Sequence, residues 1–293
     1  MVLRPFARRL WAVLDMIKVH HTVFALPFAL LAMLWAARGW PSWPVFGWIL
    51  LAMVAARSAA MTFNRIADRR YDVENPRTSR WPLSTGAVSL PFAWGFLAVC
   101  VLLLLLAAWR LNPLCLALAP LALAVLLGYS LTKRFTVFCH LFLGFADGIS
   151  APGAWIAVTG TLHGSASAWW LCGAMTTWIG GFDLLYALQD LAFDREKGLY
   201  SFPARYGVRP GLRLSTAAHL ATVACLVAAG LGAGAGWLFY AGVAATLLLL
   251  LYEHSLVKPG DLSRLGKAFF TVNGYIAIGL FLVAAADLWM GNR

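Results

Sequence analysis

The sequence has few charged residues: 12% of its 293 residues are Asp, Glu, Lys or Arg, whereas 61% are apolar. A soluble domain cannot bury so much apolar surface in one core, which excludes a soluble protein. Paired cysteines are also missing, because the five cysteines stand singly in apolar segments without a CxxC motif. This excludes a disulfide framework and a cysteine metal site. No small-residue cleavage site follows the first apolar segment, so no cleaved signal peptide is expected.

Apolar segments of about 20 residues, the length that crosses a bilayer, recur along the whole chain. Nine transmembrane helices are predicted: Val19 to Ala37, Trp43 to Phe63, Val88 to Trp109, Pro113 to Leu131, Thr136 to Val158, Ala166 to Leu188, Leu212 to Gly232, Gly236 to Leu256 and Ala268 to Asp287. The sequence shows no soluble domain or linker between them. We therefore expect an all-α integral membrane protein with one transmembrane domain over residues 1–293.

Basic residues outnumber acidic ones by 23 to 12, and their distribution predicts the orientation of the chain. With the N-terminus in the cytoplasm, only Arg38, Arg110 and Arg293 fall on the outer side. Cytoplasmic loops of membrane proteins carry an excess of Lys and Arg, so a cytoplasmic N-terminus and an outer C-terminus are predicted. Orientation accounts for most of the basic excess, and no nucleic-acid partner is expected.

The few acidic residues gather in two motifs, the first of which follows the second span. Asn64, Asp68 and Asp72 stand four residues apart, so on a helix they share one face with neighbours about 5 to 6 Å apart. Such oxygen ligands suit Mg²⁺, which commonly binds one or two carboxylates plus substrate phosphates. The alternative is a solvated helix end whose acids pair with the arginines between them.

The second motif closes the sixth span. Asp183, Asp190 and Asp194 stand at i, i+7 and i+11, with Tyr186 on the same predicted helical stripe. Asp183 falls about two turns inside the membrane, where an acid usually faces a cavity and marks a functional site. The aspartate pair of the first motif recurs here, which suggests two related halves, spans 1 to 4 and 5 to 8, plus a ninth helix. If the two motifs converge, two metal ions would bridge one diphosphate.

A diphosphate also needs cations that belong to the protein. Basic residues near the two motifs are candidates: Arg69, Arg77, Arg80, Lys133, Arg134, Arg195 and Arg205. Arginine binds phosphate through two parallel hydrogen bonds, and lysine acts as a point charge. The alternative for each is a charge that sets topology or binds lipid headgroups. Acids inside spans, Asp147 and Asp183, also fit a secondary transporter, but the remaining acids of the motifs lie at one face beside long loops, which favours an enzyme.

Together these motifs resemble those of the UbiA superfamily of intramembrane prenyltransferases, specifically the 4-hydroxybenzoate polyprenyltransferase branch. The matching segments are His21 to Pro27, the Asn64/Asp68/Asp72 motif, Asn75 to Thr78, Tyr129 to Thr136, and the Asp190/Asp194 motif through to Pro203. The resemblance implies nine helices around a central cavity in a membrane, expected to be the bacterial inner membrane, with the active site on the cytoplasmic side. It also implies Mg²⁺, a polyprenyl diphosphate and an aromatic acid acceptor, with the lipid bilayer around the prenyl tail.

The resemblance leaves the acceptor open. The start of the chain and the second motif look similar to the subgroup that serves menaquinone synthesis by the futalosine route, whose acceptor is a dihydroxynaphthoate. The alternative acceptor is 4-hydroxybenzoate, as in ubiquinone synthesis, and the rival enzyme class is a haem or chlorophyll prenyltransferase. Each of these acceptor assignments keeps the same two aspartate motifs.

The resemblance also implies a role for each matching residue. The metal ligands are Asn64, Asp68, Asp72, Asp190 and Asp194, and the four aspartates among them are catalytic. For diphosphate or acceptor binding the resemblance points to Arg69, Lys133 and Arg134, and the further expected substrate contacts are Arg77, Tyr129, Asp183, Tyr186 and Arg195. His20 and His21 either contact the acceptor or lie at the membrane interface. One position departs from the family pattern: Trp81 stands where the family commonly has an arginine, with Arg80 beside it.

Overall fold

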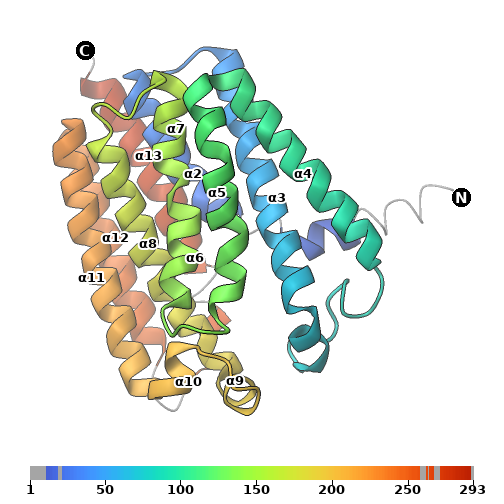
Figure 1. Cartoon of the computed structure of the whole chain (residues 1–293). Helices are drawn as coiled ribbons and strands as arrows, with labels where there is room; N and C mark the ends of the chain where they lie inside the picture. Colours follow the sequence, from blue (N-terminus) through green and yellow to red (C-terminus); the bar gives the residue numbers. More distant parts are fainter. Residues whose placement is uncertain (1–10, 19–21, 258–261, 263, 267–270, 292–293) are drawn as a thin grey trace, which may run out of the picture. The chain divides into compact units, whose positions relative to one another are not determined.

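The structure, a computed structural model, describes residues 11–18, 22–257, 262, 264–266 and 271–291. Within these ranges every regular element is a helix (Figure 1). The chain divides into two compact units, Met1–Thr22 with Gly47–Leu131, and Val23–Phe46 with Thr132–Arg293. These units do not coincide with the two predicted halves, because the first predicted span belongs largely to the second unit. The internal repeat therefore stays a prediction.

Eight helical segments of the described chain are long and apolar enough to cross a membrane. They are α3 (Trp43–Glu74), α4 (Leu90–Leu111), α5 (Pro113–Thr132), α6 with α7 (Cys139–Gly148 and Ser150–Thr159), α8 with its extension (Ala166–Tyr186, continuing to Glu196), α11 (Val208–Ala233), α12 (Trp237–Leu256) and α13 (Asn273–Gly291). Helix α2 (Thr22–Ala37) has 16 residues. The start of the first predicted span, with His20 and His21, lies outside the described residues. The all-helical membrane fold is confirmed, and the count of nine crossings stays a prediction.

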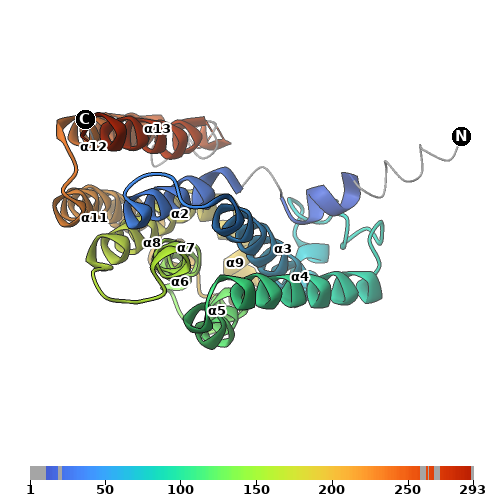
Figure 2. The ribbon, with the colours of Figure 1, turned by 90° about the horizontal axis from the view of Figure 1, so that it is seen from above.

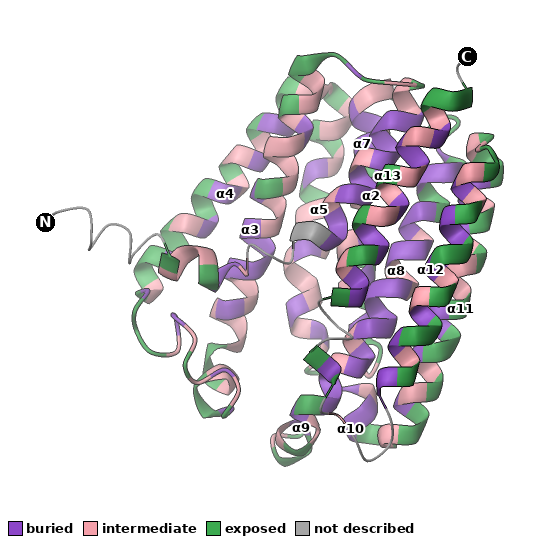
Figure 3. Cartoon of the chain, turned by 180° about the vertical axis from the view of Figure 1, so that it is seen from behind, coloured by how far each residue is buried: buried purple, intermediate pink, exposed green. Residues whose placement is uncertain are grey.

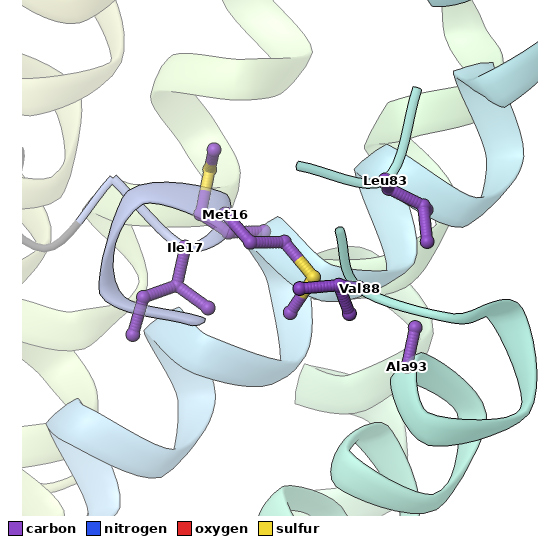
Figure 4. Packing of buried hydrophobic residues seen from close by; sticks show 6 residues of the cluster. Met16, Ile17, Leu83, Val88 and Ala93 are labelled. Carbon is purple, nitrogen blue, oxygen red and sulfur yellow. The ribbon is translucent and has the colours of Figure 1, made fainter. Parts of the chain in front are cut away.

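The first unit is built on α3, which continues well beyond the predicted end of its span. Ala59 of α3 packs against Leu97 and Cys100 of α4. A second apolar cluster joins residues 11–18, α3, the segment that links α3 to α4, and the first turn of α4; its buried members are Met16, Ile17, Met61, Leu83, Val88 and Ala93 (Figure 4). Because Leu83 and Val88 are anchored in this cluster, the linking segment is held against α3.

The second unit is built around α8, which is largely buried along its length (Figure 3). Helices α6, α7 and α11 pack against it (Figure 2). Trp178 of α8 donates a hydrogen bond from Nε1 to Oδ1 of Asn273 at 2.7 Å. Nδ2 of Asn273 in turn donates to Oε1 of Glu253 at 2.9 Å. This buried chain of hydrogen bonds connects α8, α13 and α12.

Glycines allow α6 to approach α8 closely. A Cβ atom at Gly144 would overlap the backbone carbonyl of Thr176, and one at Gly148 would lie 2.8 Å from the carbonyl oxygen of Cys172. Small residues at such contacts let two backbones meet in a membrane. The close approach brings His140, at the start of α6, beside Asp183 of α8.

Replacing Gly144 by alanine is expected to destabilise the protein. The added methyl group meets backbone rather than a flexible side chain, and overpacking of this kind costs about 1 to 3 kcal/mol. We expect the thermal midpoint in detergent to fall by at least about 3 °C. The control is Gly153→Ala, because a Cβ at Gly153 meets no atom within 4 Å. An unchanged midpoint for Gly144→Ala would contradict the close packing of α6 on α8.

Candidate functional site

The first aspartate motif lies on the last three turns of α3. The helix carries Asn64, Asp68 and Asp72 at the predicted spacing, and all three side chains are half-buried. Nδ2 of Asn64 donates a hydrogen bond to Oδ2 of Asp68 at 3.2 Å. One helix face thus presents amide and carboxylate oxygens to the same region.

The segment after α3 folds back onto this motif. The Thr78 hydroxyl donates to the backbone carbonyl of Asp72 at 2.9 Å. Arg65 lies beside the motif, with Nη1 at 3.7 Å from Oδ2 of Asp72 and its guanidinium carbon 3.6 Å from the centre of the Trp81 ring. The alternative prediction is that neighbouring arginines neutralise these acids. At Asp72 this pairing is weak, because the 3.7 Å between Nη1 of Arg65 and Oδ2 of Asp72 exceeds the length of a hydrogen bond.

Two further predicted phosphate contacts belong to this unit. Arg69 is exposed on α3. Arg77 is half-buried, and its guanidinium carbon lies 5.3 Å from the centre of the Trp81 ring. Tyr129, on α5, is half-buried.

In the second motif, the prediction that one continuous helical stripe carries all four residues is wrong. Helix α8 ends at Tyr186, a 3₁₀ turn follows over Ala187–Asp190, and α9 (Leu191–Glu196) begins after it. A 3₁₀ turn has 3.0 residues per turn instead of 3.6, so the register expected from a continuous α-helix does not extend to Asp190 and Asp194. Only Asp183 and Tyr186 lie on α8 itself.

Asp194 is fully buried and is paired with Lys133. The lysine Nζ lies 2.7 Å from Oδ1 of Asp194, while neither carboxylate oxygen receives a well-oriented hydrogen bond from the described residues. Burial alone would lower the pKa of Lys133, but the Asp194 carboxylate raises this pKa above its ordinary value. The lysine therefore carries its charge at neutral pH, and the buried carboxylate is balanced by an ion pair. Asp190 is also buried, with 7% of its surface exposed.

The predicted long loop after the second motif is an ordered segment that holds this ion pair. The Leu199 amide donates to the carbonyl of Asp194, and the Tyr200 amide donates to the carbonyl of Lys133, each at 2.8 Å. Nε of Arg195 donates to the carbonyl of Ala204, in α10 (Phe202–Tyr206), at 2.9 Å. Arg195 is a predicted phosphate contact, and its Nε is thus already occupied by a hydrogen bond within the loop.

Arg134 is exposed and directly follows Lys133. Its role as a substrate contact stays a prediction. Lys133 and Asp194 come together although the sequence separates them widely, because the segment after α9 returns to the connection between α5 and α6.

Asp183 has a partner that the sequence reasoning missed. Its Oδ2 lies 2.7 Å from Nδ1 of His140, which is buried, whereas 25% of the Asp183 side chain is exposed. A histidine inside a predicted span was the available signal, because polar residues in a membrane usually have a function. Arg57 is likewise a polar residue inside a predicted span, and it lies on α3 two turns before Asn64.

The donor atoms of both motifs fit a hard divalent cation. Asp194 has buried carboxylate oxygens whose charged partner among the described residues is Lys133, and the first motif sets carboxylates beside an amide. Within the described ranges no three His, Cys, Asp or Glu side chains gather closely enough to hold a metal ion alone. Mg²⁺ usually keeps several waters and is bound by one or two carboxylates plus substrate phosphates, so this donor set suits it.

The sequence matches the UbiA prenyltransferase family over residues 25–275. The 4-hydroxybenzoate octaprenyltransferase of Shewanella woodyi is 31% identical, with 88% of this chain and 89% of the relative aligned. The enzyme of the same name from Nitrosospira multiformis is 33% identical, with 89% of this chain and 91% of the relative aligned. These identities extend over nearly the full length of each protein.

Solved structures agree with the sequence relationship. An apo UbiA homologue from Aeropyrum pernix K1 superposes with a TM-score of 0.82 at 32% identity, covering 93% of this chain and 98% of its own. A UbiA homologue from Archaeoglobus fulgidus, bound to DMAPP and Mg²⁺, shares the fold with a TM-score of 0.70 at 20% identity, covering 94% and 99%. The chain is therefore a membrane prenyltransferase that belongs to the UbiA family.

Proposed function

We propose that this enzyme transfers a polyprenyl group from its diphosphate to an aromatic acid, with Mg²⁺, in quinone biosynthesis. The curated relatives that act on 4-hydroxybenzoate support an acceptor of this class. The observation that carries the proposal is the Lys133–Asp194 pair, in which a fully buried carboxylate has the lysine ammonium as its partner at 2.7 Å. In the proposal the carboxylate serves the metal ion and the lysine charge serves the diphosphate.

Both motifs are proposed to bind the metal ions that hold the diphosphate. Asn64, Asp68 and Asp72 supply oxygen ligands from α3, and Asp190 and Asp194 supply them from the end of the α8 segment. When bound, Mg²⁺ would neutralise the charge that develops on the leaving diphosphate. Lys133 and Arg134 add positive charge from the protein, as do Arg69, Arg77 and Arg195.

The chemistry consists of one bond broken, one bond formed and one proton removed. The allylic C–O bond breaks, and the diphosphate leaves with the electron pair. A ring carbon beside the phenolic hydroxyl forms the new C–C bond, and its proton passes to a carboxylate or phosphate oxygen. Asp190 is our candidate for assisting this proton transfer. Tyr129, Asp183 and Tyr186 are proposed substrate contacts, and the His140 pairing fixes the position of the Asp183 carboxylate.

The acceptor carboxylate is proposed to bind Arg134. Arg134→Ala is then expected to raise the KM for the aromatic acid about 10-fold or more, because a hydrogen-bonded charge pair contributes about 1.5 to 3 kcal/mol. The KM for the prenyl diphosphate should change much less. Steady-state kinetics with each substrate varied in turn checks this. A rise in the KM for the diphosphate alone would show that the role is wrong, and Arg57→Gln would then be the next variant to test.

The proposed orientation places the second motif and the N-terminus in the cytoplasm, with nine crossings. A single cysteine introduced near Gly198, in the basic segment after α9, should resist a membrane-impermeant maleimide in intact cells and react after the membrane is opened. The native cysteines are first replaced, since all five occur as free thiols. Labelling from the outer side of intact cells would overturn the orientation.

The test of the acceptor is a panel of aromatic acids supplied with a polyprenyl diphosphate to membranes that contain the protein. A prenylated 4-hydroxybenzoate, detected by mass spectrometry, assigns the ubiquinone reaction. A prenylated dihydroxynaphthoate assigns the menaquinone reaction. Membranes with the Asp68→Asn variant serve as the control, and prenylation of neither acid contradicts the proposal.

A further inference from the structure

Arg65 has a buried donor that nothing in the described chain satisfies. Only 8% of Arg65 is exposed, and its Nε has no hydrogen-bond partner among the described residues. The nearest carboxylate oxygen, Oδ2 of Asp72, lies 3.7 Å from Nη1, which is too far for a hydrogen bond. Buried polar groups are nearly always hydrogen-bonded, so a guanidinium with an unused donor calls for a partner other than the described residues.

Trp81 holds this guanidinium in place. The guanidinium carbon lies 3.6 Å from the ring centre, the distance of a stacked arginine. The backbone that carries the ring is held in place, because the Trp81 amide donates to the carbonyl of Thr78 and the Trp81 carbonyl accepts from the Thr85 amide, each at 2.9 Å. Arg65 therefore has little freedom to turn toward solvent.

Two other cations approach the same ring. Nζ of Lys18 lies 5.2 Å from its centre, and the guanidinium carbon of Arg77 lies 5.3 Å from it. Lys18 is paired with Asp15 at 2.6 Å. Asp15 offsets the Lys18 charge, whereas the Arg65 and Arg77 guanidiniums lie against the same ring and repel one another, and a bound anion would relieve this repulsion. In the proposed function Asp72 is a metal ligand, so its charge is shared with the metal rather than kept for Arg65.

We propose that Arg65 binds an oxyanion of the substrates and that Trp81 is its positioning residue. The oxyanion is a phosphate of the prenyl diphosphate or the carboxylate of the aromatic acid, both of which accept hydrogen bonds from a guanidinium. The identity of the ligand rests on the proposed function, but its binding does not require turnover. The inference also gives Trp81 a role: α3 supplies the guanidinium, and the linking segment supplies the surface that holds it.

The experiment measures binding to the purified full chain in lipid nanodiscs by isothermal titration calorimetry. One arm uses inorganic pyrophosphate with Mg²⁺, and the other uses 4-hydroxybenzoate. Arg65→Gln should weaken one of the two ligands by roughly 10- to 100-fold. Arg65→Lys, which keeps the charge but loses the planar fork, should have a smaller effect.

Trp81 variants test the positioning role separately. Trp81→Ala should weaken the same ligand by about 2- to 30-fold, and Trp81→Phe, which keeps a ring, by less. The control is Arg70→Gln, because Arg70 is exposed on the same helix and its loss removes an equal charge. Thermal midpoints of all variants are measured alongside. If the Arg65 variants do not fold, the graded effect of the two Trp81 variants decides the matter.

Loss in the pyrophosphate arm alone assigns a phosphate as the ligand, and loss in the 4-hydroxybenzoate arm alone assigns the carboxylate. Unchanged binding of both ligands in Arg65→Gln overturns the inference, as does an equal loss in Arg70→Gln or a parent that binds neither ligand. A parent that binds pyrophosphate through Arg65 but forms no prenylated product would contradict the proposed function and leave this binding site intact.

Discussion

Replacement of Asp68 or Asp190 by asparagine is expected to lower the rate of prenyl transfer at least about a thousandfold. Asparagine keeps the shape and much of the hydrogen-bonding capacity of aspartate but removes the charge that holds the metal. A structural role would be mildly affected by this change, whereas a metal ligand would be severely affected. The rate is measured at saturating concentrations of both substrates in nanodiscs.

The same two variants should fold as well as the parent. Removing a carboxylate from a cluster of acids relieves like-charge repulsion, so thermal midpoints near that of the parent are expected. Glu196→Gln is the matched control, because this side chain is 71% exposed and lies two residues beyond Asp194. If both aspartate variants retained more than about a tenth of the parent rate, the proposal of two metal motifs would be wrong.

Removal of divalent metal is expected to abolish activity completely and reversibly. Within the described residues neither motif has three acidic or other strong ligands close together, so neither is expected to keep a metal tightly without the substrate phosphates. Excess EDTA should therefore stop turnover quickly, and added Mg²⁺ should restore it. EDTA already saturated with Mg²⁺ is the control for effects of the chelator itself.

Full turnover in excess EDTA would contradict the metal assignment.

The Lys133→Met variant tests the buried ion pair. In this variant the Asp194 carboxylate loses its only ion-pair partner among the described side chains. That variant should also be less stable than the parent, because it leaves a fully buried carboxylate without a cation, a change that costs about 3 to 5 kcal/mol.

Much of the fold follows from local sequence patterns. The lengths of the apolar segments identify the helices, and the fourfold spacing of Asn64, Asp68 and Asp72 identifies the face of α3 that they share. These features depend on neighbours within a few turns, which is why the sequence is sufficient for them. The same α-helical rule fails after Tyr186, where a 3₁₀ turn changes the register of Asp190 and Asp194.

The pairings at the site depend on tertiary folding and were not predicted. Lys133 and Asp194 are each recognisable as candidates, but their contact requires the segment after α9 to return to the start of α6. The pair of His140 and Asp183 requires the close glycine contact between α6 and α8. Trp81 is visible in the sequence only as a departure from the family pattern, and its role as the surface that holds Arg65 emerges from the folded segment.

The most direct test of the account is the balance of products from the purified protein. Nanodiscs that contain the full chain are supplied with Mg²⁺, a prenyl diphosphate and 4-hydroxybenzoate or a dihydroxynaphthoate, and both pyrophosphate and prenylated acid are measured. The account predicts that one of the two acids yields prenylated product and pyrophosphate in equal amounts. Failure to prenylate either acid, under conditions in which the Shewanella woodyi relative forms its product, would contradict it.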